Sequence, residues 1–118
     1  LTVNPARAFR MADRVGSLEE GKLADVLVLR RRHDDPYENL VRARPEDIEL
    51  VLMAGRPLLA TEELAAAIGA APKGETVTIG GRRVLVEGEP ATLYREMRKA
   101  VGFDKRLEYL PFEPGAAS

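Results

Sequence analysis

The chain has 118 residues and a mass of 13.0 kDa, and its 18 basic and 19 acidic side chains leave a formal charge of −1. This is the length of one ordinary domain or two very small ones, and the near-neutral charge excludes a protein that attracts nucleic acid or anionic lipid through its overall field. The absence of cysteine excludes disulfides, thiol catalysis and zinc–thiolate sites, and the single histidine, His33, excludes any mechanism that needs two or three imidazoles within this chain.

The chain opens with the signals of a helix, a turn and a strand. Asn4 is expected to cap the helix with its side chain, and Pro5 to occupy the first helical position, where its missing N–H costs nothing. Good helix formers continue this helix through residues 6–11. The glycines of residues 16–22 predict a turn. Residues 24–29 are nearly all apolar and predict a buried strand.

Two similar hairpins are predicted in the second half, where residues 49–56 resemble residues 75–82. In each, an apolar strand meets a two-residue turn that ends in glycine, and Gly80-Gly81 supplies the positive φ angles of a type I′ turn. Chance similarity remains an open alternative to a true repeat. The flanking elements are the returning strands and the helical stretches that follow: residues 56–60, 61–70, 82–87 and 90–101. In the last helix Leu93, Met97 and Val101 fall on one face.

A charged loop over residues 30–36 holds the cluster that most resembles a metal site, and a short helix over 37–43 follows it. His33, Asp34, Asp35 and Glu38 could supply one imidazole and three carboxylates to a hard cation. Calcium-loop spacing is absent and adjacent aspartates seldom converge on one ion, so the pattern favours a solvated loop. The preceding basic residues, 30–32, are largely cancelled by the two aspartates, so phosphate-backbone binding is expected to be weak.

No other motif predicts chemistry. Residues 16–22 match most of a phosphate-binding loop, but Leu23 replaces the serine or threonine that holds magnesium, and a helix rather than a strand precedes the turn. A serine–histidine relay lacks support because the only serines are Ser17 and Ser118. We therefore expect no catalytic, cofactor-binding or metal-binding residue in this chain.

Hydropathy and the N-terminal residues predict where the protein is located and whether the chain is part of a longer protein. No segment approaches the ~18 continuous apolar residues of a transmembrane helix, and no signal sequence opens the chain, so we expect a cytoplasmic protein without a membrane or nucleic-acid partner. Because the chain starts at Leu1 rather than methionine, we expect a piece of a longer protein, with a complete small protein as the alternative. The residues from 113 onward are expected to be flexible.

Several stretches in the first half resemble the closing segment of the amidohydrolase superfamily. They read TVNPARA at residues 2–8, DRVGSLEEGKLADVLV at 13–28, DPYENLV at 35–41 and ELVLMAGRP at 49–57. The resemblance covers residues 2–60 and is nearest to the branch with cytosine deaminases and triazine chlorohydrolases. It implies an α+β, β-rich fold in which residues 1–12 end a barrel helix and 13–60 form β-sandwich strands. Residues 61–118 then add a helix, a hairpin and a further helix.

The resemblance also carries an expectation about chemistry and partners. Such hydrolases bind divalent metals of the zinc or iron class through a His-x-His pair, further histidines and an aspartate, and none of these ligands carries over to this chain. The chain is then the non-catalytic C-terminal portion of a C–N-bond hydrolase, and its partner is a barrel domain or another copy of itself. Since family strands from before the barrel are absent here, strands over 24–29 and 48–53 are expected to show unpaired edges and to drive dimerisation or aggregation. The alternative is a stand-alone β-rich interaction module with no catalysis.

Overall fold

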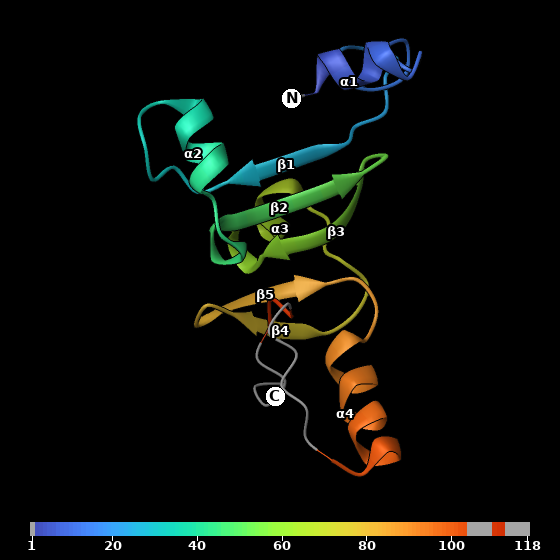
Figure 1. The fold of residues 1–118 in the computed structure, drawn as a ribbon, viewed down its shortest axis with the longest axis vertical. Coiled ribbons are helices and arrows are strands. Elements are labelled where there is room, and N and C mark those ends of the chain that lie inside the picture. Colours follow the sequence, from blue (N-terminus) through green and yellow to red (C-terminus); the bar gives the residue numbers. More distant parts are fainter. Residues whose placement is uncertain (1, 104–109, 113–118) are drawn as a thin grey trace.

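The computed structural model describes residues 2–103 and 110–112, and its centre is a five-stranded antiparallel sheet (Figure 1). The strand order is β1-β2-β3-β5-β4, with bounds β1 Val26–Leu29, β2 Ile48–Met53, β3 Arg56–Thr61, β4 Thr76–Ile79 and β5 Arg82–Val86. The helices are α1 Val3–Ala8, α2 Pro36–Arg42, α3 Glu62–Ile68 and α4 Pro90–Val101, with a 3-10 turn, η1, at Pro45–Asp47. The predicted α+β, β-rich fold class is confirmed.

Both predicted hairpins form, and their turns share one backbone conformation. Gly80 and Gly81 have φ angles of 54° and 77°, as a type I′ turn requires. Ala54 and Gly55 have nearly the same values, 49° and 78°, although alanine carries a Cβ that disfavours a positive φ. The likeness of the two hairpins therefore extends from sequence to turn geometry.

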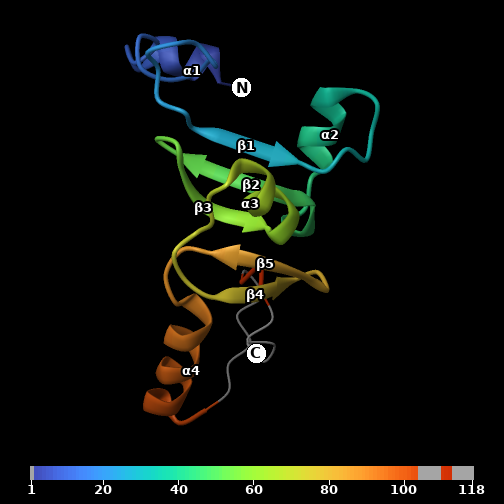
Figure 2. The same ribbon diagram turned by 180° about the vertical axis from the view of Figure 1, so that it is seen from behind.

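Alternation along the strands divides the apolar side chains between the two faces of the sheet, and each face has a small core. One core is formed by Leu50, Ala60 and Ala65, where α3 covers the sheet; Figure 2 shows α3 in front of it. The other core, on β4 and β5, is completed by the first turn of α4 and by Phe112. Both cores are modest, since Val77 is the largest side chain that is almost fully buried.

The structure corrects two details of the first predicted elements. Thr2, not Asn4, precedes α1 and makes no side-chain cap, and α1 ends at Ala8, before Arg10 adopts a φ of 55°. Asn4 lies inside the helix because the chain enters helical conformation two residues earlier than its capping signals indicate. The strand predicted over residues 24–29 is shorter and not buried: β1 is an edge strand, and Leu27 is 51% exposed.

The remaining predicted helices are present with small shifts. Asp35 caps α2 by accepting a hydrogen bond from the backbone N–H of Glu38 at 2.7 Å. The α4 helix has the predicted span, but Leu93, Met97 and Val101 are exposed rather than packed on the sheet. Within the described residues, no helix is long and apolar enough to cross a membrane. The predicted flexible tail from residue 113 lies outside the described residues.

Pairing of the strands decides which edges stay open. β2 pairs with β1 on one side and β3 on the other, so the expected unpaired edge over residues 48–53 is wrong. The reason is that the hairpin partner β3 and the preceding strand β1 take the two sides of β2, while β5 of the second hairpin covers the outer edge of β3. Among the described strands, β1 and β4 are the two that lie at the edges of the sheet.

Candidate functional site

The strongest candidate for a functional surface surrounds the edge strand β1. A hollow of about 580 Å³ lies between β1 and the α1 region, and its lining includes Phe9, Leu18 and Leu27. A second hollow of about 470 Å³ lies between β1 and α2, and Leu27 lines this one as well. The two hollows thus meet at β1. We call the exposed apolar side chains around them the β1 surface: Phe9, Met11, Leu18, Leu23, Leu27 and Leu40.

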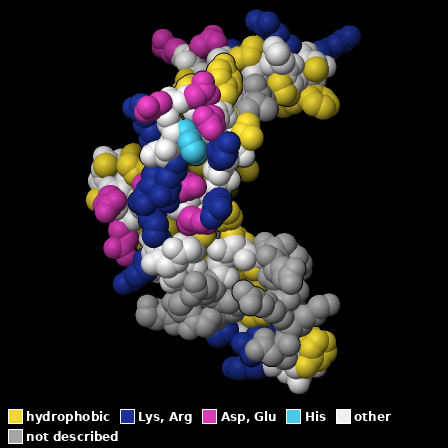
Figure 3. Space-filling model, turned by 60° about the vertical axis from the view of Figure 1, so that its left-hand side comes forward, with side chains coloured by type: hydrophobic (Ala, Val, Ile, Leu, Met, Phe, Trp, Pro, Cys, Tyr) yellow, Lys and Arg dark blue, Asp and Glu magenta, His cyan; other side chains and the backbone are white. Residues whose placement is uncertain are grey.

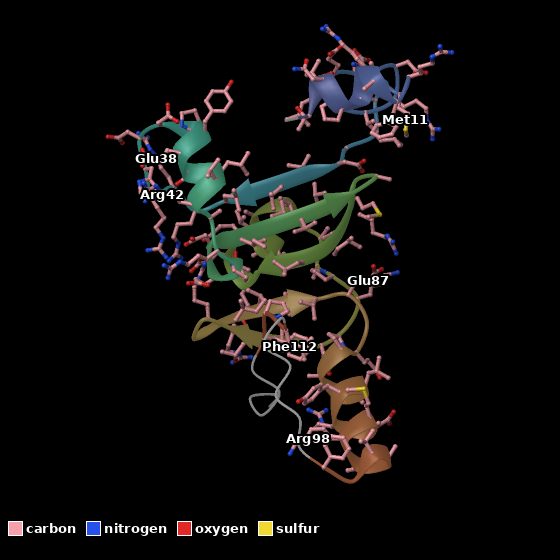
Figure 4. All side chains as sticks on the ribbon, in the orientation of Figure 1. Met11, Glu38, Arg42, Glu87, Arg98 and Phe112 are labelled. Carbon is pink, nitrogen blue, oxygen red and sulfur yellow. The ribbon has the colours of Figure 1, made fainter. Side chains whose placement is uncertain are left out.

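The sequence keeps the α1 side of this surface in place through a tight loop. Gly16 has a φ of +100°, and a Cβ there would lie 2.6 Å from the Cβ of Ala6, so a larger residue would push α1 away. The backbone N–H of Leu23 donates to the carbonyl of Arg14 at 2.8 Å, which closes the loop just before β1. Figure 4 shows Met11 below α1, on the side of the sheet, and Figure 3 shows hydrophobic side chains gathered around the α1 end.

The turn over residues 16–22 is closed on itself rather than open to a phosphate. The Nζ of Lys22 donates to Ser17 Oγ at 2.7 Å and to Glu19 Oε1 at 3.1 Å. The hydrogen bond from Ser17 and the contacts with Lys22 hold the pKa of Glu19 below its usual value. Because the lysine amine is already engaged by a carboxylate, and a strand follows the turn, the geometry of a phosphate-binding loop is not formed here.

The His33 cluster is dispersed among separate structural roles. Asp34 pairs with Arg31 at 2.8 Å, Asp35 caps α2, and Glu38 pairs with Arg42 at 2.9 Å (Figure 4). The backbone N–H of His33 donates to Asn39 Oδ1 at 3.0 Å. Within residues 2–103 and 110–112, no group of three histidine, aspartate or glutamate side chains is placed to hold a metal ion.

A second charged network was not anticipated from the sequence, because its members lie far apart along the chain. Glu49 Oε1 accepts from Arg30 Nε at 3.1 Å and from Arg82 at 3.0 Å, which ties the end of β1 to β2 and β5. Asp47 is buried and accepts from Arg32 Nε at 2.7 Å and from the backbone N–H of Arg44. The Arg32 hydrogen bond is the main reason that the pKa of Asp47 lies below its usual value.

This network also explains the basic stretch before His33. Arg30, Arg31 and Arg32 each pair with a carboxylate of the same chain. Figure 3 shows acidic and basic side chains intermixed on this face. Each arginine therefore supports the β1–α2 connection in the folded chain, and the sequence signals that indicate this are the acidic residues at 34, 47 and 49.

The family of the chain follows from comparison with known proteins. A model of the amidohydrolase family matches residues 1–101, which is more than half of the 118 residues. The chain belongs to the amidohydrolase family. No individual curated protein and no solved structure gives a significant match. The family match continues past residue 60, where the resemblance noted in the sequence ends, and takes in α3, the second hairpin and α4.

Amidohydrolases generally use a divalent metal, but the residues that the structure describes do not fit one. His33 is the only imidazole, and the three carboxylates nearest to it in sequence are each turned to a different partner. A zinc site needs three or four convergent ligands. The described residues therefore form no site for metal-dependent catalysis. The chain is linked to hydrolases by the family match.

Proposed function

We propose that this chain is the non-catalytic C-terminal portion of a metal-dependent amidohydrolase of the cytosine deaminase and triazine chlorohydrolase branch. Its role is to dock on the catalytic barrel through the β1 surface and to steady it. The observation that carries this proposal is the juxtaposition at one end of the sheet: an open strand edge lies beside two hollows that share Leu27, one mostly apolar and the other lined by apolar and polar side chains in equal number. In this assignment residues 1–12 end a barrel helix, residues 13–60 form the strands beside the barrel, and residues 61–118 extend them.

The overall dimensions support a surface that a larger partner covers. The radius of gyration is 16.5 Å, whereas a compact domain of 118 residues has about 13.5 Å. The accessible area is 8616 Å², against about 6,300 Å² for a compact protein of this mass. The excess of roughly 2,300 Å² is comparable with the share that one partner contributes to a permanent interface, about 1,000–2,500 Å².

The chemistry of the edge supports the same reading. β1 offers one row of backbone N–H and C=O groups to its open side, and its side chains are all apolar. Such an edge favours addition of a further strand, which satisfies the backbone groups and removes Leu27 from water. A barrel domain that supplies a strand and an apolar helix face matches both needs.

The alternative function, a stand-alone interaction module with no catalysis, also has one observation in its favour. The second hairpin continues the sheet beyond β3, so four of the five strands are held without any help from β1's open edge. In that case the β1 surface would bind a different protein or a second copy. The size and apolar character of the β1 surface fit either partner, and the family relationship favours the barrel.

The sequence that precedes Leu1 in the natural protein gives the first test, since a barrel with a His-x-His pair is expected there. The barrel and this chain are then produced as separate pieces and mixed. We expect a stable complex that hydrolyses a C–N bond when loaded with metal, and we expect Leu27→Asp to abolish complex formation. Leu93→Asp, on α4, is the matched control and should bind normally. A barrel that is fully active and soluble without this chain would overturn the scaffold role.

A further inference from the structure

The helix α2 is attached to the rest of the fold differently from the other helices. Among the four α-helices that the structure describes, it alone contains no buried residue. Two of its large side chains, Tyr37 and Val41, are 72% and 79% exposed. In Figure 1 and Figure 2, α2 stands beside the end of β1, away from the layer in which α3 covers the sheet. Polar contacts, rather than burial of apolar side chains, therefore hold α2 in place.

The side chain of Asn39 fastens the middle of α2 to the loop that follows β1. Its Oδ1 accepts hydrogen bonds from the backbone N–H groups of Arg32 and His33, at 2.7 and 3.0 Å. Its Nδ2 donates to the carbonyl of Arg30 at 3.1 Å. We call these three contacts the Asn39 latch. Because one side chain makes all three, its replacement by alanine opens the latch completely.

Next to the latch, the two ends of the segment that carries α2 are fastened to each other at Asp47. The carbonyl of Asp47 accepts from the backbone N–H of Arg30 at 2.7 Å. Its carboxylate is buried and accepts from Arg32 Nε at 2.7 Å and from the backbone N–H of Arg44 at 3.1 Å. Residues 33–43 thus start and end at a closed base, so α2 can change position without breaking the pairing of β1 with β2.

The same helix forms one wall of the hollow of about 470 Å³ beside β1. Leu40 lines this hollow from the helix, and Leu27 and Leu29 line it from the strand. An apolar side chain of a segment docked at β1 would lie between these leucines and remove them from water. Docking at β1 therefore gives α2 the apolar contact that it lacks in the free chain.

From this arrangement we propose that α2 is a clamp, a helix that opens independently of the sheet in the free chain and closes on the barrel segment that docks at β1. The identity of the partner rests on the proposed function, whereas the independent opening is a property of this chain alone. Parts of a protein with few buried apolar side chains open locally at a smaller free energy than global unfolding requires. Docking favours the closed position because Leu40 is buried against the partner only there.

Hydrogen exchange of the full chain tests the independent opening. The amides in the last turn of α2 should exchange about tenfold faster than the paired amides of β2, and about tenfold faster again in Asn39→Ala, with β2 unchanged. Glu38→Gln is the matched control, because it breaks the surface ion pair with Arg42 and leaves the Asn39 latch intact. Its exchange should stay within about twofold of the wild type. Equal rates in α2 and β2, or equal acceleration of both by Asn39→Ala, would overturn the independent opening.

The complex with the barrel tests the closing. Binding of the barrel should slow exchange in α2 by about tenfold, and Leu40→Ala should release the barrel about tenfold faster with little change in the association rate. Val41→Ala is the matched control, since Val41 is exposed and outside the lining of the hollow, and it should release the barrel like the wild type. A barrel that binds but leaves exchange in α2 unchanged would overturn the clamp and leave the proposed function standing. A barrel that does not bind the wild-type chain would overturn the proposed function, and the closing step with it.

Discussion

The carboxylate of Asp25 accepts a hydrogen bond from the backbone N–H of Ala54, with Oδ1 and N separated by 2.8 Å. Next to it, the carbonyl of Ala24 accepts from the backbone N–H of Gly55 at 3.0 Å. The two contacts fasten the β2–β3 turn to the residues that lead into β1. They explain why an alanine–aspartate pair stands before the apolar strand: the aspartate accepts a turn N–H that would otherwise lack a protein partner.

Replacing Asp25 with alanine should therefore destabilise the first hairpin. We expect Asp25→Ala to lower the free energy of unfolding by about 1 kcal/mol, the net worth of an ordinary hydrogen bond at an accessible site. Urea denaturation followed by circular dichroism gives the value. Asp13→Ala is the control, since Asp13 is exposed and outside this contact. Equal effects of the two substitutions would show that the contact contributes nothing.

The two hairpin turns predict opposite effects of substitution. At Gly81, where φ is 77° and no atom would obstruct a Cβ, Gly81→Val should destabilise by about 1–3 kcal/mol through backbone strain alone. At the equivalent type of turn, Ala54 already bears a similar strain, so Ala54→Gly should leave stability unchanged or raise it by up to about 1 kcal/mol. Thermal melts measure both. An unchanged melting temperature for Gly81→Val would mean that the turn has a different conformation in solution.

Local signals were sufficient to predict most elements of this fold. Glycine pairs located both hairpin turns, and Pro90 with the spacing of Leu93, Met97 and Val101 predicted the span of α4. What the spacing could not predict is the face on which α4 packs. That face is decided by Ala91 and Tyr94, and by Glu75, which lies 16 and 17 residues before its partners Ala91 and Thr92 and holds the start of the helix.

At the candidate site, too, local sequence predicted the secondary structure but not the long-range pairing. The apolar run at residues 24–29 predicted a strand correctly and its burial wrongly, because burial depends on whether another strand pairs with the open edge. The pairing of β5 with β3 was also missed, since it joins residues more than twenty positions apart. Hydropathy alone does not distinguish an apolar strand that is buried in a core from an apolar strand whose edge is open to another chain.

Glu75 makes the attachment of α4 sensitive to acid. Burial raises the pKa of its carboxyl group, but hydrogen bonds from Ala91 and Thr92 outweigh this and hold the pKa below the usual value of 4.5. The stabilisation is therefore present above about pH 4.5 and lost as the pH falls through the lowered pKa. Glu75→Gln should melt at a lower temperature than the wild type at pH 7, and the difference should shrink towards pH 3. A difference that is constant with pH would contradict this role; Glu89→Gln is the control.

Metal analysis tests the assignment of the chain as non-catalytic. Because the described residues contain no convergent set of ligands, we expect less than one tenth of a zinc ion per chain after dialysis against metal-free buffer. We also expect no hydrolysis of amides and no deamination of nucleobases by the chain alone. One zinc ion per chain that is lost in His33→Ala would contradict the prediction. Asn39→Ala, which releases the backbone around His33 without removing the imidazole, separates loss of a ligand from loss of local structure.

The β1 surface predicts how the isolated chain assembles. Its open strand edge and exposed apolar side chains allow two copies to pair edge to edge. Sedimentation over a hundredfold range of concentration should therefore show association of the isolated chain. Leu27→Lys should block the β1 edge and give a monomer with cooperative unfolding, because the second hairpin and both cores are untouched. Leu93→Lys, on the exposed face of α4, is the matched control and should associate like the wild type. Association that persists in Leu27→Lys would show that another surface drives it.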